Sequence, residues 1–399
     1  MTGSAQSAIR APDRKEAIAQ ASAELFAERG FAAVGIDDIG AAVGITGPAI
    51  YRHFAGKEAL LGAVILGLLE EFVRRAEDVS ATVEEGTGSA DPLADLVAGS
   101  VDIALDSPAQ VATYIRERGR LSGEMARQAA VHARQLRGIW ESILRQEFPT
   151  LPSELVAVRQ EAVLGVTGAM TLLRTGVVRP RLDELLIEAS LRMLRMPAAA
   201  PTTGTPQHVE PSWQPQISRR EAILNAALTL MRVKGYAGVG IDEIGEAAGI
   251  SGPAVYRHYA SKSDILLDAY DRVGSRVAVG VESALDGATG PTDALRRLID
   301  SYVTIAFDNV DLIIATGQEG AALPKAERPR LVRQRRDIAE SWIRVVLELR
   351  SDLTEPEVRM HVASVFPMVN HVAQLPAREI DRVPEVKALV GELLVGAPA

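Results

Sequence analysis

Residues 35–61 read GIDDIGAAVGITGPAIYRHFAGKEALL, and residues 240–266 read GIDEIGEAAGISGPAVYRHYASKSDIL. Seventeen of these 27 aligned positions are identical, at a constant offset of 205 residues. Most of the differences are mild, such as Thr46 against Ser251. Self-similarity at a fixed offset indicates an internal repeat, and chance does not account for a match of this quality.

The repeat extends in both directions from this stretch. Upstream, residues 14–18 match residues 219–223, and downstream the offset becomes 202, where Trp140 corresponds to Trp342. Between the copies, residues 197–216 read PAAAPTTGTPQHVEPSWQPQ, and their five prolines indicate a semi-extended linker. The chain is therefore a duplication whose copies diverge most after the stretch of highest identity.

The composition fits two folded units. The chain has 399 residues, 47% hydrophobic and 24% charged, and this length predicts at least two domains. The absence of cysteine excludes disulfides and thiolate sites. Residues 1–12 lack the apolar core of a signal peptide, and the most apolar run, residues 60–69, is too short to span a bilayer. We therefore expect a cytoplasmic protein.

Each copy begins with the pattern of three short helices. Apolar residues recur at helical spacing over residues 14–29, and residues 36–43 predict a second helix that Gly44 can end in a left-handed cap. Thr46 is a suitable N-cap for a third helix over residues 47–54. The second copy repeats each signal. Two short helices joined by a tight glycine turn form a helix-turn-helix.

The third helix has the features of a DNA-recognition helix. Its first turn carries small side chains, which would let it approach base edges closely, and the following donors suit phosphate oxygens. Alternatives stay open, since His53 can be an ordinary surface histidine and Lys57 can be merely solvated, and we favour a core position for Phe54. The predicted DNA-binding residues are Thr46, Gly47, Ala49, Tyr51, Arg52, His53 and Lys57 in the first copy and Ser251, Gly252, Ala254, Tyr256, Arg257, His258 and Lys262 in the second.

The order Gly-hydrophobic-Asp-Asp-Ile, then Gly-Ile-Thr-Gly-Pro-Ala-Ile-Tyr-Arg-His-Phe, then Lys-Glu-Ala-Leu resembles the TetR/AcrR family of bacterial repressors. The resemblance covers about 50 residues of each copy. It implies that some residues of this motif lie in or near the major groove and that others contact the DNA backbone. The matching residues of the second copy are implied to have the same roles. The implied groove residues are Thr46, Gly47, Ala49 and Arg52, and the implied backbone contacts are Tyr51, His53 and Lys57.

The resemblance also implies an all-α fold, in which each copy joins a helix-turn-helix domain to a helical effector and dimerisation domain. The expected domains are 11–71 and 72–196 in the first copy, and 217–276 and 277–399 in the second, with 197–216 as the linker.

Fusion of two modules is a departure from the family, whose members usually carry one module and act as homodimers. The equivalent dimerisation helices are expected at 153–174, 181–195, 355–375 and 383–395. We expect these helices to form an intrachain pseudo-dimer that reads a quasi-palindromic operator with unequal half-sites. A stable two-chain species with four DNA modules is the alternative.

The later helices of each copy are rich in Leu, Val and Ala, and family members hold a small, largely apolar ligand among such helices. Residues 114–120, YIRERGR, could pair with an acidic ligand such as an acyl thioester of coenzyme A, or could be a solvated or interface face. Their counterpart, residues 316–322, has no arginine. For the tryptophans we favour core positions over ligand contact. The candidate ligand-binding residues are Tyr114, Arg118, Trp140, Met170 and Leu173 in the first copy and Gln318, Trp342, His361, Met368, Asn370 and His371 in the second.

We predict a DNA-binding transcriptional regulator, a repressor relieved by a small apolar or acidic effector, with no cofactor or metal. An architectural DNA-binding protein is the alternative, and an enzyme is disfavoured because no nucleophile motif or metal-ligand cluster stands out. A cavity of a few hundred Å³ would favour an effector.

The two modules differ in charge, although the whole chain is acidic, at −9. Five Lys and Arg face seven Asp and Glu over residues 13–58, whereas six face four over residues 218–263. We hypothesise that the second module binds DNA more tightly than the first.

Overall fold

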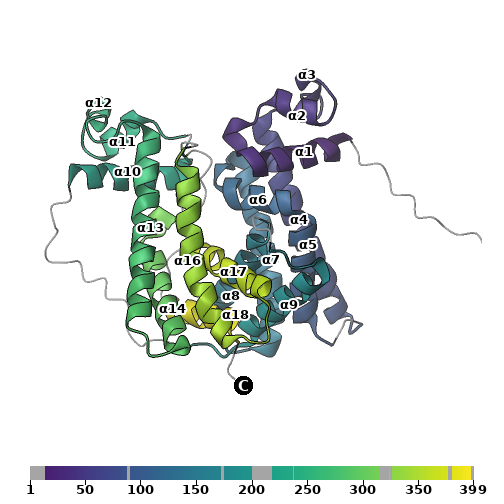
Figure 1. Ribbon diagram of the computed structural model, residues 1–399. Coiled ribbons are helices and arrows are strands. Elements are labelled where there is room, and N and C mark those ends of the chain that lie inside the picture. The colour runs from purple at the N-terminus through teal and green to yellow at the C-terminus, as the bar shows by residue number, and fades with distance from the viewer. Residues whose placement is uncertain are drawn as a thin grey trace, which may run out of the picture.

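The computed structural model describes residues 14–87, 90–171, 175–199, 218–236, 238–313, 323, 326–375 and 380–396. Every regular element within these ranges is a helix, which confirms the all-α prediction (Figure 1). Most of the predicted linker, residues 200–216, lies outside the described residues.

The first copy contains nine α-helices and two short 3-10 turns among its described residues. They are α1 (Arg14–Arg29), η1 (Phe31–Ala33), α2 (Ile36–Ala42), α3 (Gly47–Ile50), α4 (Lys57–Glu84), α5 (Pro92–Asp106), α6 (Pro108–Glu117), η2 (Arg118–Arg120), α7 (Gly123–Glu147), α8 (Ser153–Ala169) and α9 (Arg179–Arg195).

The second copy repeats this order. Its described helices are α10 (Arg219–Lys234), α11 (Ile241–Ala247), α12 (Gly252–Val255), α13 (Lys262–Asp286), α14 (Pro291–Asp308), α16 (Arg328–Leu349), α17 (Glu355–Ala373) and α18 (Val383–Leu394).

The helix-turn-helix of the first copy forms largely as its sequence predicts. Gly30 and Gly44 have φ of 80° and 70°, the left-handed values that end a helix most easily at glycine. Thr46 is the N-cap of α3, but its side chain makes no capping hydrogen bond. The helix α3 is shorter than predicted because regular helix ends at Ile50, and a turn covers the next three residues.

Each helix-turn-helix module has its own small core. In the first module Ile18, Phe26, Ile39 and Phe54 pack together, and Phe54 is only 6% exposed, which agrees with the favoured core position. The second module repeats this packing, with Tyr259 in the place of Phe54.

The remaining helices of both copies share one continuous core. The helices α8, α9, α17 and α18, which were expected to join the copies, pack against one another at the end of the molecule opposite the modules (Figure 1). The helices α8 and α17 approach at Gly165, where a Cβ atom would lie 2.7 Å from Met368 Cα. Glycine is therefore needed for this close backbone contact between the copies.

A buried ion pair crosses the same bundle. Arg159 on α8 donates from Nε to Glu385 Oε1 on α18 at 2.7 Å, and both side chains are almost fully buried. Arg159 also donates to the Leu194 carbonyl at 2.7 Å. Since isolated charges are strongly disfavoured in a protein interior, each partner depends on the other. Across the described helices, none combines the length and apolar character that crossing a bilayer requires.

Candidate nucleic-acid interface and ligand cavity

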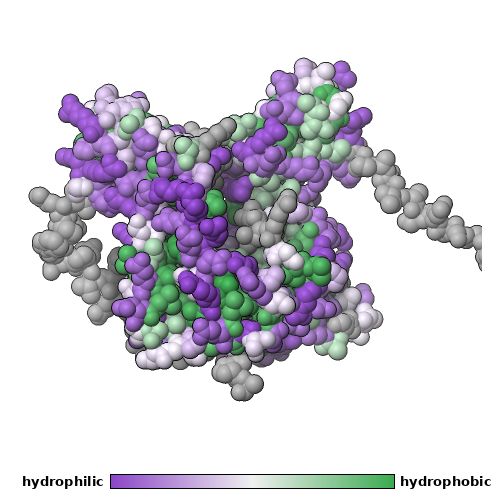
Figure 2. Space-filling model, viewed as in Figure 1, coloured by the Kyte–Doolittle hydropathy of each residue, from purple (hydrophilic) through white to green (hydrophobic). Residues whose placement is uncertain are grey.

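The two predicted recognition helices lie at the same end of the molecule. In Figure 1, α3 and α12 are at the tips of the two modules, and Figure 2 shows these modules as separate lobes with a hollow between them. The bundle that joins the copies holds both lobes from below. The arrangement lets both tips face one extended surface.

Several side chains predicted to bind DNA project from these tips. Tyr51 is 58% exposed and Tyr256 is 57% exposed, which is unusual for large aromatic side chains. The neighbouring cationic and polar positions on the tips are also accessible, whereas Ala49, Ala254, His258, Lys57 and Lys262 are half-buried. The exposed members are Thr46, Tyr51, Arg52, His53, Ser251, Tyr256 and Arg257.

The predicted groove positions of Gly47 and Gly252 need correction. Both glycines are buried, and a Cβ atom at Gly47 would lie 1.9 Å from Asp37 Oδ1 on α2. The same clash at Gly252 involves Asp242, at 1.8 Å. These glycines therefore let the two helices of the motif pack closely, and they do not line the exposed surface.

The phosphate contact predicted for Lys57 and Lys262 also needs correction. The Lys57 ammonium is half-buried and donates to the carbonyls of Phe31 and Val34 at 2.9 and 3.0 Å. Lys262 repeats this arrangement on the corresponding carbonyls of the second module, both at 2.7 Å. Each lysine thus links the start of a long helix to the loop before the motif. In doing so, its ammonium group uses N–H donors that a phosphate contact would need.

Sequence reasoning missed one residue behind the second tip. Arg220 on α10 donates to the His258 carbonyl at 2.7 Å, and its guanidinium lies 4.1 Å from the centre of the Tyr259 ring. Lys15 is the equivalent residue of the first copy and lies 5.6 Å from the Phe54 ring centre. The match of residues 14–18 with 219–223 aligns Lys15 with Arg220, and this alignment is the sequence signal that could have identified the pair.

A cavity of about 320 Å³ lies between the later helices of the second copy and the first copy. Second-copy helices α13, α14, α16 and α17 form most of its wall, including Val273, Tyr302 and Phe366. Ile115 and Arg118 close it from the first copy. A cavity of this size with a few polar groups is typical of a small-molecule site.

Three of the predicted ligand-binding residues line this cavity, namely Arg118, Asn370 and His371. Leu173 and Gln318 lie outside the described residues. The other predicted side chains do not line this cavity and pack in the core or beside it. They are Tyr114, Trp140, Met170, Trp342, His361 and Met368.

The polar end of the cavity is organised by side chains from both copies. Tyr302 donates to Asn370 Oδ1 at 2.9 Å, and burial raises the pKa of Tyr302. His371 lies 2.7 Å from Glu161 Oε2 on α8. Burial opposes ionisation of Glu161, but His371, Arg118 and Arg137 outweigh it and hold the pKa of Glu161 below its ordinary value.

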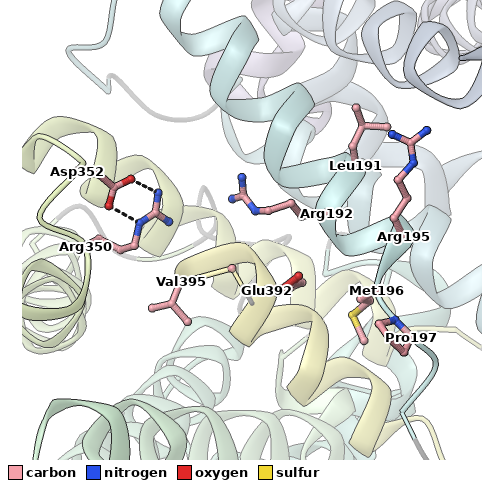
Figure 3. A pocket seen from close by; sticks show the side chains of 10 residues that line it. Leu191, Arg192, Arg195, Met196, Pro197, Arg350, Asp352, Glu392 and Val395 are labelled. Carbon is pink, nitrogen blue, oxygen red and sulfur yellow. Dashed lines mark hydrogen bonds and ion pairs between the residues drawn. The ribbon is translucent and has the colours of Figure 1, made fainter. Parts of the chain in front are cut away.

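A second hollow lies at the opposite end of the bundle and is open and charged (Figure 3). Arg350 is paired with Asp352 there, and Arg192 points into the space between the copies. Behind it, burial and the positive charges of Arg192 and Arg350 together lower the pKa of His361 to about 4. Two of its three arginines are already paired with acids, Arg350 with Asp352 and Arg195 with Glu147, so this groove shows no preference for one class of ligand.

The chain was compared with known protein families. The family described as bacterial regulatory proteins, tetR family, matches residues 18–64 and 223–269, which are the two helix-turn-helix modules.

Individual relatives match over parts of the chain. The transcriptional activator FasR of Mycolicibacterium smegmatis is 33% identical over 22% of this chain, which spans 40% of that relative. The regulator AcuR of Cereibacter sphaeroides is 29% identical over 37% of this chain and 72% of its own length. The repressor KstR2 of Mycobacterium tuberculosis is 30% identical over 33% of this chain and 66% of its own length.

Solved structures resemble one copy at a time. A TetR-family regulator from Bordetella parapertussis has 21% identity and a TM-score of 0.41, over 45% of this chain and 95% of its own. AibR in complex with isovaleryl coenzyme A and operator DNA has 17% identity and a TM-score of 0.40, over 45% of this chain and 100% of its own.

Proposed function

Because this chain belongs to the TetR family of bacterial regulatory proteins and carries two of that family's DNA-binding modules, we propose that it is a ligand-responsive repressor that reads one operator with both modules. The observation that carries the proposal is the position of α3 and α12 at the same end of one molecule (Figure 1). A regulator of this kind acts in the cytoplasm, where its DNA lies. The domain limits 11–71, 72–196, 217–276 and 277–399 are part of the proposal.

The shared bundle supports an intrachain pseudo-dimer. The helices α8 and α17 cross at Gly165 with backbone contact, and Arg159 pairs with Glu385 across the same bundle. Two recognition helices held by a pseudo-two-fold arrangement read two half-sites in successive major grooves. Because α3 and α12 are alike but not identical, the half-sites are similar and unequal.

The exposed tips supply the proposed contacts. Arg52 and Arg257 reach base edges or phosphates, and the hydroxyl groups of Tyr51 and Tyr256 bind the DNA backbone. Thr46, Ala49, His53, Ser251, Ala254 and His258 complete the proposed surface. Gly47, Gly252, Lys57 and Lys262 support it from behind.

The cavity of about 320 Å³ favours an effector over a purely architectural role. Ligand binding releases DNA when the ligand binds more tightly to the geometry that does not fit the operator.

Footprinting on the DNA that flanks the protein's own gene tests the proposal. We expect two protected half-sites, with a binding stoichiometry of one chain per site in light scattering. The double variant R52A/R257A should lose the footprint while keeping the helical circular dichroism spectrum. Two chains on every site would contradict the intrachain pair, and no protection anywhere would contradict operator reading.

The control variant R127A removes an arginine from the exposed surface of α7, where its partner is Glu124 in the same helix. It should leave the footprint unchanged. A loss with R127A as large as with R52A/R257A would mean that overall charge, and not the recognition tips, determines binding.

A further inference from the structure

The cavity is built from both copies, although most of its wall belongs to the second. Arg118 in η2 of the first copy donates from Nη2 to Gln374 Oε1 of the second copy at 3.3 Å. Gly165, Gly168 and Ala169 of α8 complete the first-copy wall. A ligand in this cavity would therefore touch both copies at once.

The charges around the cavity favour an anionic group on the ligand. Arg118 and Arg335 both line the wall, and no carboxylate does so among the described residues. Glu161 on α8 is paired with His371 of the cavity wall and lies 3.9 Å from Arg137. Among the described residues no carboxylate lies within ion-pair distance of Arg118. Its guanidinium donates to Gln374 and lies 5.2 Å from the Tyr114 ring centre, and its charge also acts on Glu161, so a carboxylate ligand would add a direct ion pair to these contacts.

The rest of the wall is apolar and limits the size of the ligand. Val273, Val277, Ile313 and Ile338 line the cavity with aromatic side chains beside them. A volume of about 320 Å³ suits a compact molecule with an apolar body and does not enclose a whole coenzyme A thioester.

Residues 117–120, which include Arg118, contact both DNA-binding modules. Glu117 is buried and accepts a hydrogen bond from the Phe31 amide of the first module at 2.9 Å. Arg120 pairs with the other oxygen of Glu117. Arg120 also lies against Gly235, which ends α10 of the second module, since a Cβ atom there would be 3.3 Å from Arg120 Nη1. We name residues 117–120 the bridge segment.

From these observations we propose that the cavity binds one small apolar carboxylate per chain, with the carboxylate on Arg118, and that the bridge segment transmits binding to both modules. The proposal rests on the proposed function, of which it names the ligand class and the route of regulation. The site is single because residues 316–322, the counterpart of residues 114–120, contain no arginine. A change at Arg118 displaces Arg120, and with it the contacts to Phe31 and Gly235.

Calorimetry on the full chain without DNA tests the ligand class. The probes are straight-chain carboxylates from hexanoate to dodecanoate, with decan-1-ol and decylamine as matched neutral and cationic compounds. We expect one decanoate per chain, bound at least tenfold more tightly than decan-1-ol, with decylamine weakest. The variant R118M should bind decanoate at least tenfold more weakly and decan-1-ol unchanged, whereas R127M should match the wild type.

Three results would overturn this part of the proposal. They are two decanoate molecules per chain, equal affinity of R118M and wild type for decanoate, and no binding of any of these carboxylates at millimolar concentration. Because no DNA is present, each result is independent of operator binding.

Operator affinity with and without decanoate tests the bridge segment. In the wild type, decanoate should change operator affinity at least tenfold. The variant R120M should bind decanoate within twofold of the wild type, but decanoate should then change its operator affinity less than threefold. A full decanoate effect in R120M overturns the route through Arg120. Failure of the free wild type to bind any operator would instead overturn the proposed function and leave the calorimetric result standing.

Discussion

The two copies of this chain agree closely in sequence over their first 50 or so residues and diverge after them. In the modules, equivalent residues repeat the same interactions, such as the carbonyl contacts of Lys57 and Lys262. In the bundle, equivalent positions hold different groups, since Arg159 of the first copy corresponds to His361 of the second at the offset of 202. Two similar recognition surfaces are therefore held by a helical bundle whose two halves carry different residues at equivalent positions.

The largest expected effect concerns the first of these two bundle positions. The variant R159A leaves Glu385 buried without its cation, and removal of one partner from a buried pair costs about 4 kcal/mol. Urea unfolding measures this loss. The double variant R159M/E385L should recover most of the stability, and a single variant as stable as the wild type would mean that the pair is hydrated.

The equivalent position in the second copy should respond to pH. His361 is buried, and its pKa falls from the ordinary 6.5 to about 4. The unfolded chain therefore binds a proton more readily, so this contribution to stability is complete above pH 6.5 and is lost as the pH falls toward 4. The loss is about 3 kcal/mol. The variant H361M should reduce the decline between pH 7 and pH 4, and an unchanged decline would place the titration elsewhere.

A single added methyl group should disturb the contact between the two copies. The variant G165A places a methyl group 2.7 Å from Met368 Cα, and overpacking of this kind costs about 2 kcal/mol. The matched control is G138A on α7, where a Cβ atom meets nothing within 4 Å and replacement of a helical glycine is ordinarily stabilising. Equal unfolding midpoints for both variants would show that the bundle yields easily at this crossing.

The two module lysines should behave alike. K57M and K262M each remove hydrogen bonds from a charged donor to two carbonyls, at a cost of about 1.5 kcal/mol in module stability. Operator affinity below the unfolding transition should change less than threefold, because the ammonium groups face the protein. A tenfold loss of operator affinity in a variant that remains folded would instead support the predicted phosphate contact.

The smallest expected difference separates the two recognition tips. The second module has more positive charge, so R257A should weaken operator binding about tenfold and R52A about threefold, as measured by fluorescence anisotropy at fixed salt. An equal or larger loss from R52A would contradict the idea that the second module grips more strongly.

Local features of the modules could be predicted from the sequence, whereas contacts between the copies could not. The bounds of α1 were predicted correctly because helical periodicity and Gly30 act over a few residues. The inward turn of the Lys57 ammonium depends on carbonyls that folding brings near it. Arg118 was expected to serve a pocket of its own copy, and it lines a cavity of the other because packing of α8 against α17 unites residues more than 200 positions apart.

The bundle of α8, α9, α17 and α18 has a consequence for dosage in the cell. A regulator assembled from separate subunits loses its paired form on dilution, so its occupancy of DNA depends steeply on copy number. Here the partner is tethered by the chain, and its effective concentration is set by geometry alone. Under the proposed intrachain pairing, occupancy should therefore follow simple one-to-one saturation, so that a few molecules per cell would keep a gene silent without an assembly threshold.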